Sequence, residues 1–481
     1  MRRVKGLLKT RRQPLTNGGG KRIMVGLAGR ERMKEKRETP MSPSLMIAIG
    51  FALLILLVTL LLMLPISSQS RTVTPPLTAL FTATSAVCVT GQVLVDTGMH
   101  WSLFGQVVLI AAIQIGGLGV MTLLALVSMA MGRRIGLRQR TILQESVASF
   151  SVGGIVRLIR LALIGTAVIE GLGAAALAFR FVPMLGWAKG LCYSVFHAIS
   201  AFCNAGFDLM GPVSGSFSSL ECFVGDPLIN LTVMTLILVA GLGFPVWQDL
   251  AQNRLCWKKL RLHTRAVLAL TAFLVLVPAA LFFITERNAT MAGMTTGTRV
   301  WASLFSAVTP RTAGFDTVPT GELSPAGGML TLLLMLTGGN SGSTAGGAKT
   351  TTLLLVVLTA VSILRGEEDV HIFGRRIEND LLRRACSIVV VYLTLGAMAT
   401  LAICAMQPEF TLQQVLIEVF SAIDTVGLTA GITRQLNTAS RVLLILLMYA
   451  GRLGSMTFMI LLTRRKPPAP VQYPTDKILV G

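Results

Sequence analysis

The sequence predicts an all-α integral membrane protein, in which four units of helix, re-entrant loop and helix surround a pseudo-fourfold axis. Three observations predict this class. The 481 residues are 53% hydrophobic and 14% charged, whereas an average soluble domain is about 25% charged. Apolar segments of about 20 residues, the length that crosses a bilayer, recur along the chain. Similar glycine-containing motifs recur, one between the two members of each successive pair of these segments.

The chain begins with a basic segment. Residues 1–40 hold 13 basic and 3 acidic side chains, with too few apolar residues for a core, and we expect a cytoplasmic tail here. The net charge of the whole chain is +21. Because the other basic residues recur in short stretches between apolar segments, they fit the positive-inside rule, and no nucleic-acid partner is expected.

The first apolar segment, 45–64, has 20 residues and no charge. It predicts a retained transmembrane helix rather than a cleaved signal. Further apolar segments lie at 103–131, 161–179, 228–247, 266–284, 385–406 and 442–463. One more segment, 327–364, is split by a Gly-rich stretch, so the sequence predicts eight spans.

Basic clusters fall between consecutive pairs of spans. Their members are Arg133, Arg134, Arg138 and Arg140, then Arg254, Lys258, Lys259, Arg261 and Arg265, then Arg375, Arg376, Arg383 and Arg384, and finally Arg464, Arg465 and Lys466. Together with the basic N-terminus they mark one side of the membrane. An even number of spans then predicts a multi-pass plasma-membrane protein with both termini in the cytoplasm.

The linkers on the opposite side each contain a partly apolar stretch that is too short to cross a bilayer, and these stretches predict re-entrant half-helices. In the first, second and fourth stretches a Ser-Ala pair precedes a glycine at a fixed offset. The third stretch has Ser306-Ala307 and ends at Gly314. The fixed pairs are Ser85 and Gly91, Ser200 and Gly206, and Ser421 and Gly427. The glycines are 115 (91 to 206), 108 (206 to 314) and 113 (314 to 427) residues apart, which predicts a fourfold repeat.

The repeat divides the chain into six parts. We expect a basic tail at 1–40 and a C-terminal cytoplasmic tail at 464–481. The four pore repeats are predicted at 41–132, 133–253, 254–374 and 375–463.

Glycine at these four places has a specific use. A chain that turns its carbonyls toward a narrow axis must visit left-handed φ/ψ, which glycine reaches without steric cost. Four such segments would replace the hydration shell of an ion with carbonyl oxygens. Half-helices whose C-terminal ends point inward would favour a cation there. The alternative is that the glycines only allow close helix packing.

The Gly-rich stretch 337–352 predicts a gate inside the third repeat. Its spacing, Gly342-x-x-x-x-Gly347-Ala348-Lys349, differs from a phosphate-binding P-loop, and no strand pattern precedes it, so nucleotide binding is not expected. Small side chains would let this stretch move aside, and Lys349 adds a positive charge near its cytoplasmic end. The alternative is a helix kink that only improves packing.

Two charged side chains lie within apolar spans. Arg452 lies midway along the last span and Glu170 midway along the third, and both should face protein or water, because burial in lipid costs a few kcal/mol. For Arg452 we expect a role in tethering the Gly-rich loop or in the pathway itself, with carboxylates such as Asp424 as partners. For Glu170 a buried structural pair is one interpretation.

Enzymatic chemistry is not expected. The seven cysteines include no C-x-x-C pair, and the four histidines (His100, His197, His263 and His371) show no spacing typical of metal ligands. No nucleophile and base stand out. A rocking symporter remains an alternative, although the predicted repeats all share one orientation, whereas inverted repeats are common in that class.

The chain resembles the Trk/Ktr/HKT superfamily of potassium transporters, and most of all the Ktr-type membrane subunit. The resemblance covers about residues 45–463, and its motifs are segment 84–91, Ala205-Gly206-Phe207, Arg311-Thr-Ala-Gly314-Phe315, Thr425-Val-Gly427 and segment 338–352. It implies potassium uptake through a gated, channel-like pore, and it leaves sodium stimulation open.

The resemblance also implies roles for particular residues. The selectivity filter would be Val89, Thr90, Gly91, Asn204, Ala205, Gly206, Thr312, Ala313, Gly314, Thr425, Val426 and Gly427. The gate would include Gly338, Gly339, Gly342, Ser343, Thr344, Gly346, Gly347 and Lys349. Arg452 would tether the loop or act as a charge barrier.

Partners follow from the resemblance as well. It implies a homodimer in the lipid bilayer, with a cytosolic KtrA/TrkA-like ring that binds ATP/ADP or NAD(H). No cofactor is expected in this chain, and no metal beyond the transported monovalent cations. Asn340 and Ser341 stand where Ktr-type chains often have Ser-Pro, and Ser455 replaces a common proline. Gly91, where many plant HKT transporters have serine, favours potassium over sodium.

Overall fold

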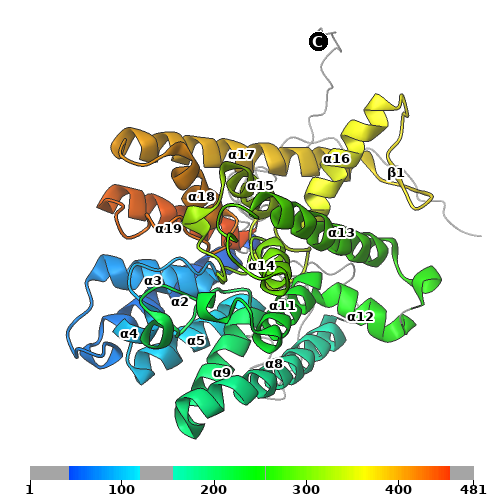
Figure 1. Cartoon of the computed structure of the whole chain (residues 1–481). Coiled ribbons are helices and arrows are strands. Elements are labelled where there is room, and N and C mark those ends of the chain that lie inside the picture. Colours follow the sequence, from blue (N-terminus) through cyan, green and yellow to red (C-terminus); the bar gives the residue numbers. More distant parts are fainter. Residues whose placement is uncertain (1–42, 120–154, 255, 455–481) are drawn as a thin grey trace, which may run out of the picture. The chain divides into compact units, whose positions relative to one another are not determined.

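The fold is all-α, as the sequence predicts. The computed structural model describes residues 43–119, 155–254 and 256–454. Within these ranges the only strands are β1 (His371–Ile372) and β2 (Arg375–Arg376), which pair antiparallel as one small hairpin. The helices follow one another around a central region, with colours running from blue through green to orange in Figure 1.

The helices of the first two units follow the predicted order. The first unit has α2 (Pro43–Met63), η1 (Pro65–Ser67), α3 (Pro76–Cys88), α4 (Thr97–His100) and α5 (Leu103–Leu118). The second has α8 (Ile155–Leu185), α9 (Trp187–Phe202), α10 (Gly211–Ser214), η2 (Glu221–Phe223), α11 (Pro227–Leu242) and α12 (Phe244–Asn253). The half-helices of these units are α3 and α9.

The third and fourth units repeat this order. The third has η3 (Trp257–Lys259), α13 (Leu262–Thr285), α14 (Thr296–Val308), η4 (Thr320–Glu322), α15 (Pro325–Thr337) and α16 (Thr350–Leu364). The fourth has α17 (Asn379–Met406), α18 (Leu412–Ile423) and α19 (Thr438–Leu453). Here the half-helices are α14 and α18, which completes the set of four.

Four helices in the described ranges are long and apolar enough to cross a membrane, namely α2, α8, α13 and α17. They correspond to the predicted spans 45–64, 161–179, 266–284 and 385–406. Each carries large apolar side chains on its outer surface, for example Leu53 at 61% exposed and Leu401 at 72% exposed. Such exposure of leucine is expected where lipid, rather than water, surrounds the helix.

The second helix of each unit corrects the sequence prediction. The spans 103–131, 228–247 and 442–463 were predicted as continuous, but α5, α11 and α19 stop at Gly119, Gly243 and Gly454. After Gly243, α12 turns away from α11 by 89°. Residues 120–131 and 455–463 lie outside the described residues. The break in the third unit, between α15 and α16, is as predicted.

A left-handed glycine causes each break. The φ angles are +86° at Gly119, +94° at Gly243, +53° at Gly338 and +80° at Gly454. In every case the glycine N–H bonds the carbonyl three residues earlier, which closes the last helical turn. Mean hydropathy carries no information about the φ angle of a glycine. The helix breaks inside these continuous apolar segments were therefore not predicted.

The units contact one another in a closed cycle. The second helix of each unit packs against the half-helix of the next: α5 against α9, α11 against α14, α15 against α18, and α19 against α3. The first and last units are therefore neighbours, as the adjacent blue and orange-red helices in Figure 1 show. This cycle brings the four half-helices together.

Candidate functional site

The four half-helices end beside one another, a few residues before the predicted filter glycines. Three-residue segments follow them, at 89–91, 204–206, 312–314 and 425–427, and we call these the filter segments. The last residue of each is a glycine at positive φ: +99° at Gly91, +68° at Gly206, +78° at Gly314 and +97° at Gly427. The left-handed backbone expected of these glycines is thus present in all four.

The first residue of each filter segment is also left-handed, which the sequence did not predict. The φ angles are +57° at Val89 and Asn204, +75° at Thr312 and +51° at Thr425. Three of these residues are β-branched, and for them such a conformation costs on the order of 1–3 kcal/mol each. The surrounding structure must hold the four segments in place to keep this strain.

The four glycines approach one another in a ring. A Cβ atom placed on Gly91 would lie within 2.8 Å of the carbonyl oxygen of Ala205. A Cβ atom placed on each of the other three glycines would likewise meet the carbonyl oxygen of the residue that precedes the next unit's glycine. The pairs are Gly206 with Ala313, Gly314 with Val426, and Gly427 with Thr90. Each glycine therefore faces the carbonyl that precedes the next unit's glycine, and no side chain fits.

Hydroxyl groups behind the ring hold the filter backbone. In the first and fourth units Ser85 and Ser421 accept the N–H of Gly91 and Gly427, both at 3.0 Å. In the second unit Ser200 donates to the carbonyl of Phe207 at 2.7 Å. The Ser-to-Gly spacing that recurs in the sequence thus places one serine behind each of these three segments.

The third unit uses a different residue for this task. Thr309, not Ser306, donates to the carbonyl of Phe315, at 2.6 Å. The turn is one residue shorter here, because the N–H of Ala313 bonds the carbonyl four residues back, whereas Thr90 bonds the carbonyl five residues back. Aligning the repeats on Ser306 misses this shift. Ser306 is left without a role in the filter.

Several polar atoms of the filter segments have no partner among the described residues. They are both amide atoms of Asn204 and the hydroxyls of Thr90, Thr312 and Thr425, all at least 99% buried. Buried polar atoms are rarely left unpaired in folded proteins. The four backbones approach one another closely, and these polar atoms are free to bind water or an ion that has lost its hydration shell. Such an arrangement suits an ion path.

A buried carboxylate joins the first and fourth units beside the filter. Glu418 on α18 is 0% exposed. Its Oε2 accepts from Gln92 Nε2 at 2.9 Å and Thr433 Oγ1 at 2.8 Å, and its Oε1 accepts from the N–H of Ala430 at 3.1 Å and from Thr429 Oγ1. Gln92 directly follows Gly91, so this contact fixes the chain at the filter. Glu418 was not singled out from the sequence, although a lone carboxylate in an apolar half-helix is a usable signal.

A charge exchange tests the Glu418 contact. The substitution Gln92→Glu places a second carboxylate against Glu418, and we expect it to lower uptake at least about tenfold, the effect of 1.4 kcal/mol. The double variant Gln92→Glu with Glu418→Gln restores one amide and one carboxylate, and it should recover most of the uptake. Rubidium uptake at matched membrane abundance measures both. If the double variant does not regain rubidium uptake, the contribution of Glu418 to uptake does not depend on its contact with Gln92.

The Gly-rich loop lies against the second unit. Residues 338–349 form no helix. The hydroxyl of Thr344 donates to the carbonyl of Phe202, the last residue of α9, at 3.2 Å. Asn340 Nδ2 donates to the carbonyl of Gly241 at 2.9 Å, and the N–H of Phe244 donates to the carbonyl of Gly342 at 2.9 Å. The loop is thereby attached at the point where α11 breaks.

The same loop contacts the fourth unit. The N–H of Ala348 donates to Asp424 Oδ1 at 2.9 Å, and the N–H of Gly347 donates to the carbonyl of Gly451 at 3.3 Å. A Cβ atom on Gly346 would collide with the side chain of Thr425, the first residue of a filter segment. The loop therefore lies directly against the filter, on the side where the half-helices end, which we call the inner side.

Arg452 fixes the loop from the last helix. Its guanidinium donates to the carbonyl of Thr344 at 2.6 Å, and to the carbonyls of Gly117, at 3.0 Å, and Gly116. One side chain thus joins the loop to the broken end of α5. The expected pairing of Arg452 with Asp424 is wrong for the described residues, because backbone carbonyls satisfy the guanidinium and Asp424 receives the loop N–H instead.

Lys349 and Glu170, the two other charged residues named from the sequence, are held by nearby groups. Lys349 donates to the carbonyls of Ala345 and Gly346 at 2.8 and 2.9 Å, so its ammonium closes the loop on itself. Glu170 is 8% exposed and accepts from Gln114 Nε2 at 3.2 Å. Its partner in the described residues is an amide, not a cation. No group of three or more His, Cys, Asp or Glu that could hold a metal ion is present in the described ranges.

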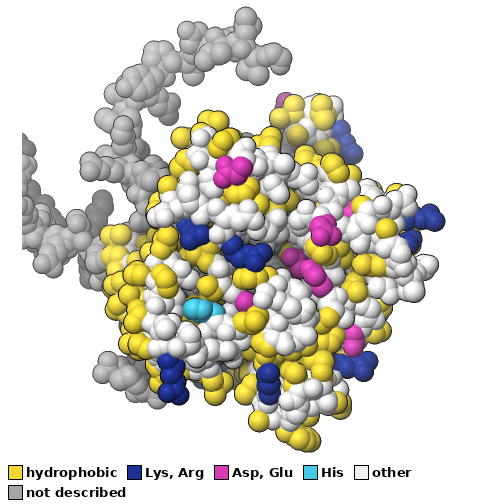
Figure 2. Space-filling view, turned by 60° about the vertical axis from the view of Figure 1, so that its left-hand side comes forward, with side chains coloured by type: hydrophobic (Ala, Val, Ile, Leu, Met, Phe, Trp, Pro, Cys, Tyr) yellow, Lys and Arg dark blue, Asp and Glu magenta, His cyan; other side chains and the backbone are white. Residues whose placement is uncertain are grey.

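The surface also suits a membrane setting. Figure 2 shows a face whose left-hand and lower margins are largely hydrophobic, with acidic side chains and some Lys and Arg nearer its middle and other Lys and Arg at its right-hand and lower edges. A hydrophobic margin of this kind is expected where lipid contacts the protein.

Comparisons with known proteins agree with this geometry. The sequence matches the TrkH family, described as "Cation transport protein", over residues 22–470. It is 38% identical to Ktr system potassium uptake protein B of Bacillus subtilis, over 92% of this chain and 97% of that protein. It is 40% identical to the potassium/sodium uptake protein NtpJ of Enterococcus hirae, over 93% of this chain and 99% of that protein. The solved potassium transporter TrkH of Vibrio parahaemolyticus shares the fold, with a TM-score of 0.66 at 17% identity, over 89% of this chain and 86% of that chain.

Proposed function

The chain belongs to the TrkH family of cation transport proteins, and on that premise we propose how it takes up potassium as the membrane subunit of a Ktr/Trk-type system. Family membership makes it a cation transporter rather than an enzyme in the usual sense. Cations would pass along the axis between the four filter segments. The ring in which each filter glycine faces a carbonyl of the next unit is the observation that carries this proposal.

The filter role of the twelve segment residues follows from their backbone. Carbonyls on a narrow axis can replace the water around an ion, and the C-terminal ends of α3, α9, α14 and α18 make the potential there negative. Both features favour a monovalent cation. The proposed repeat boundaries remain 41–132, 133–253, 254–374 and 375–463, with tails at 1–40 and 464–481.

The gate role of loop 338–349 follows from its contacts. It lies against the inner side of the filter and is held by the second and fourth units and by Arg452. Conduction requires these contacts to open. A gate closed by a few hydrogen bonds can be biased by a partner, since each bond is worth about 1 kcal/mol.

The assembly that we propose is a homodimer in the plasma membrane, with both termini in the cytoplasm. A separate cytosolic ring of KtrA/TrkA-like subunits, which would bind ATP/ADP or NAD(H), would act on the gate from below. The name "Ktr system" of two relatives, from Bacillus subtilis and Vibrio alginolyticus, supports a system of several components.

A second candidate is uptake of sodium along the same path. The Enterococcus hirae relative, named a potassium/sodium uptake protein, favours it. A rocking cation symporter is less well supported, because the units form one closed cycle of the same contacts rather than an inverted pair.

The first experiment is growth and rubidium uptake in a bacterium that lacks its own potassium uptake. The chain is expressed alone and then with a cytosolic regulatory subunit. We expect growth at limiting potassium that depends on Gly91 and Gly427 and increases with the partner. Uptake of radioactive sodium at similar rate would favour the second candidate. No uptake of either ion by an inserted chain with a matched partner would contradict both.

A further inference from the structure

Each half-helix carries a polar residue one turn before the residue whose hydroxyl holds the filter backbone. Residues three apart lie on the same face of a helix, so these polar side chains share the face that carries the hydroxyls. Once the third unit is aligned on its threonine rather than on its serine, the set is complete. Its members are Thr82, His197, Ser306 and Glu418, which precede Ser85, Ser200, Thr309 and Ser421 by three residues.

His197 and Glu418 make the same contact in their two units. Nε2 of His197 accepts the N–H of Leu209 at 3.3 Å, and Oε1 of Glu418 accepts the N–H of Ala430 at 3.1 Å. Leu209 and Ala430 each follow the filter glycine of their unit by three residues. The gate contacts residues that precede the filter glycines. These two contacts therefore lie on the opposite side of the filter, which we call the outer side.

Both side chains also reach the next unit of the cycle. Gln92 Nε2, in the first unit, donates to Glu418 Oε2 at 2.9 Å and to its backbone carbonyl at 3.1 Å. The ring of His197 lies 6.5 Å from the ring of Phe315, in the third unit, measured between centroids. Gln92 and Phe315 each directly follow the filter glycine of their unit. Glu418 thus joins the fourth and first units, and His197 joins the second and third.

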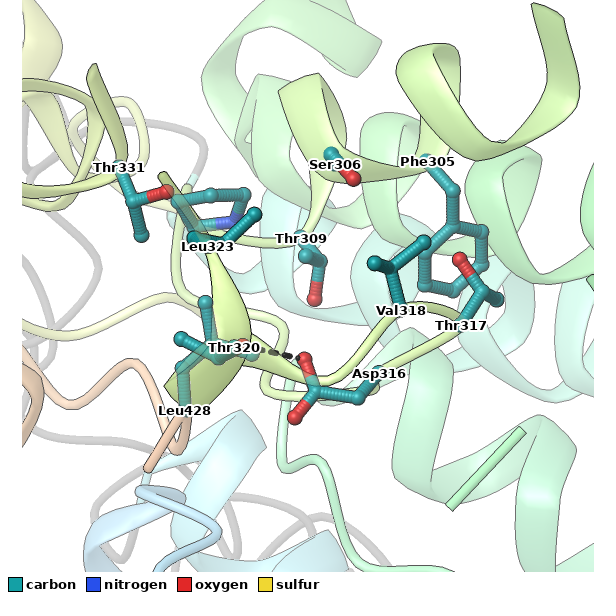
Figure 3. Close-up of a pocket in the computed structure, with 11 residues that line it drawn as sticks. Phe305, Ser306, Thr309, Asp316, Thr317, Val318, Thr320, Leu323, Thr331 and Leu428 are labelled. Atoms are coloured by element: carbon teal, nitrogen blue, oxygen red, sulfur yellow. Dashed lines mark hydrogen bonds between the residues drawn. The ribbon is translucent and has the colours of Figure 1, made fainter. Parts of the chain in front are cut away.

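The other two units carry shorter side chains at this position. Thr82 is 0% exposed, and its hydroxyl has no partner among the described residues. Ser306 lines a small cavity together with Asp316 and Thr317 (Figure 3). The space open to the centre of a water-sized sphere there is about 10 Å³, which is room for about one water molecule. On the outer side, the first and third units therefore depend on the long side chain of the unit before them.

The hydrogen bonds of His197 define one state of its ring. The carbonyl of Tyr193, 2.7 Å from Nδ1, can only accept, so Nδ1 carries the hydrogen. Because the N–H of Leu209 donates to Nε2, the ring is neutral. It is 1% exposed, and the rings of Phe181 and Phe196 lie 5.3 and 6.0 Å from it. A neutral ring that is fixed on every side is suited to holding backbone in place.

We propose that His197 is a positioning residue that determines the preference of the filter for potassium over sodium. The proposal rests on the proposed function and deepens it. Carbonyl oxygens that replace the hydration shell of an ion must stand at a separation that suits that ion. Sodium is smaller than potassium, so its rejection requires that the carbonyls be held apart. Without His197, the second and third filter segments would be free to close on the smaller ion.

Two substitutions of similar size test the contact to Leu209. Glutamine offers an oxygen that can accept the N–H of Leu209, whereas methionine has the same length and only a weakly accepting sulfur. Rubidium and radioactive sodium uptake are measured for the full chain, at matched membrane abundance, in a bacterium that lacks its own potassium uptake. We expect His197→Met to lower the ratio of rubidium to sodium uptake at least about tenfold. His197→Gln should retain most of the wild-type ratio.

Thr82→Val is the matched control. It changes the equivalent position of the first unit, keeps the shape of the side chain and removes a hydroxyl that has no partner among the described residues. We expect the wild-type ratio of rubidium to sodium uptake. A fall in Thr82→Val as large as that in His197→Met would overturn the proposal, because any change on this face of a half-helix would then have the same effect.

The remaining outcomes are distinct. A lower ratio in His197→Met than in His197→Gln supports the proposal. A purely structural role lowers uptake of both ions in equal proportion, so a wild-type ratio in an inserted His197→Met chain would overturn it. If His197→Met does not accumulate, His197→Phe, which keeps a planar ring without an acceptor, decides in its place. Equal uptake of both ions by the wild type would overturn this inference alone, whereas uptake of neither would overturn the proposed function and this inference with it.

Discussion

Replacing Gly91 or Gly427 by aspartate is expected to abolish rubidium uptake while the chain still inserts in the membrane. Alanine at Gly427 should suffice. Its Cβ would collide with the carbonyl of Thr90 and lie 3.0 Å from the Cα of Gly314, so two neighbouring filter segments must move. Displacement of this kind by about 1 Å can cost a hundredfold in rate, and we expect at least about that loss.

Gly293 provides the matched control for Gly427. It also has a left-handed φ, of +79°, but a Cβ atom there meets nothing within 4 Å. Gly293→Ala carries the same backbone strain, about 1–2 kcal/mol, without the collision. We expect normal uptake at normal membrane abundance. If Gly427→Ala transports as well as Gly293→Ala does, the ring of glycines is not the filter.

Replacing Arg452 by glutamine is expected to raise uptake by the chain alone and to weaken its dependence on a regulatory partner. The guanidinium joins the loop carbonyl of Thr344 to the carbonyls of Gly116 and Gly117. A hydrogen bond to a charged group contributes about 1.5–3 kcal/mol. If this bond is present only in the closed state, its loss shifts the equilibrium between closed and open states toward the open state by about tenfold.

Arg441 is the control for Arg452, because it lies on the same helix and also donates to a backbone carbonyl, that of Arg434. Arg441→Gln removes a positive charge from α19 without touching the loop, and its uptake should stay at the wild-type level. Rubidium uptake with and without the regulatory subunit measures both variants. Unchanged or lower uptake in an inserted Arg452→Gln chain would contradict a tethering role.

The four breaks in the second helices show where sequence reasoning reached its limit. The break after Thr337 was predicted because a long run of small polar residues and glycines interrupts the apolar pattern. The breaks at Gly119, Gly243 and Gly454 were not, because each depends on the φ angle of one glycine inside an apolar run. Composition alone cannot distinguish such a glycine from Gly171, which lies inside α8.

In the filter segments, too, some residues could be predicted from the sequence and others could not. The glycines were identifiable because four motifs recur at similar spacing and because left-handed backbone needs glycine. The partners were not. Thr309 replaces Ser306 behind the third segment through a turn that is one residue shorter, and Glu418 meets Gln92 across 326 residues of sequence.

The sequence by itself determined the membrane class, the order of helices and half-helices, the four glycines that we propose for the filter, and the interrupted third unit. Hydrophobic length, glycine recurrence and polar composition are local properties, and they can be read without coordinates. Only the tertiary structure decided which carbonyl each glycine faces, that Arg452 holds backbone carbonyls rather than Asp424, and that Ser306, Asp316 and Thr317 share one cavity. Those relations depend on how four separate units close into a ring, and no local property of the chain specifies the distances between them.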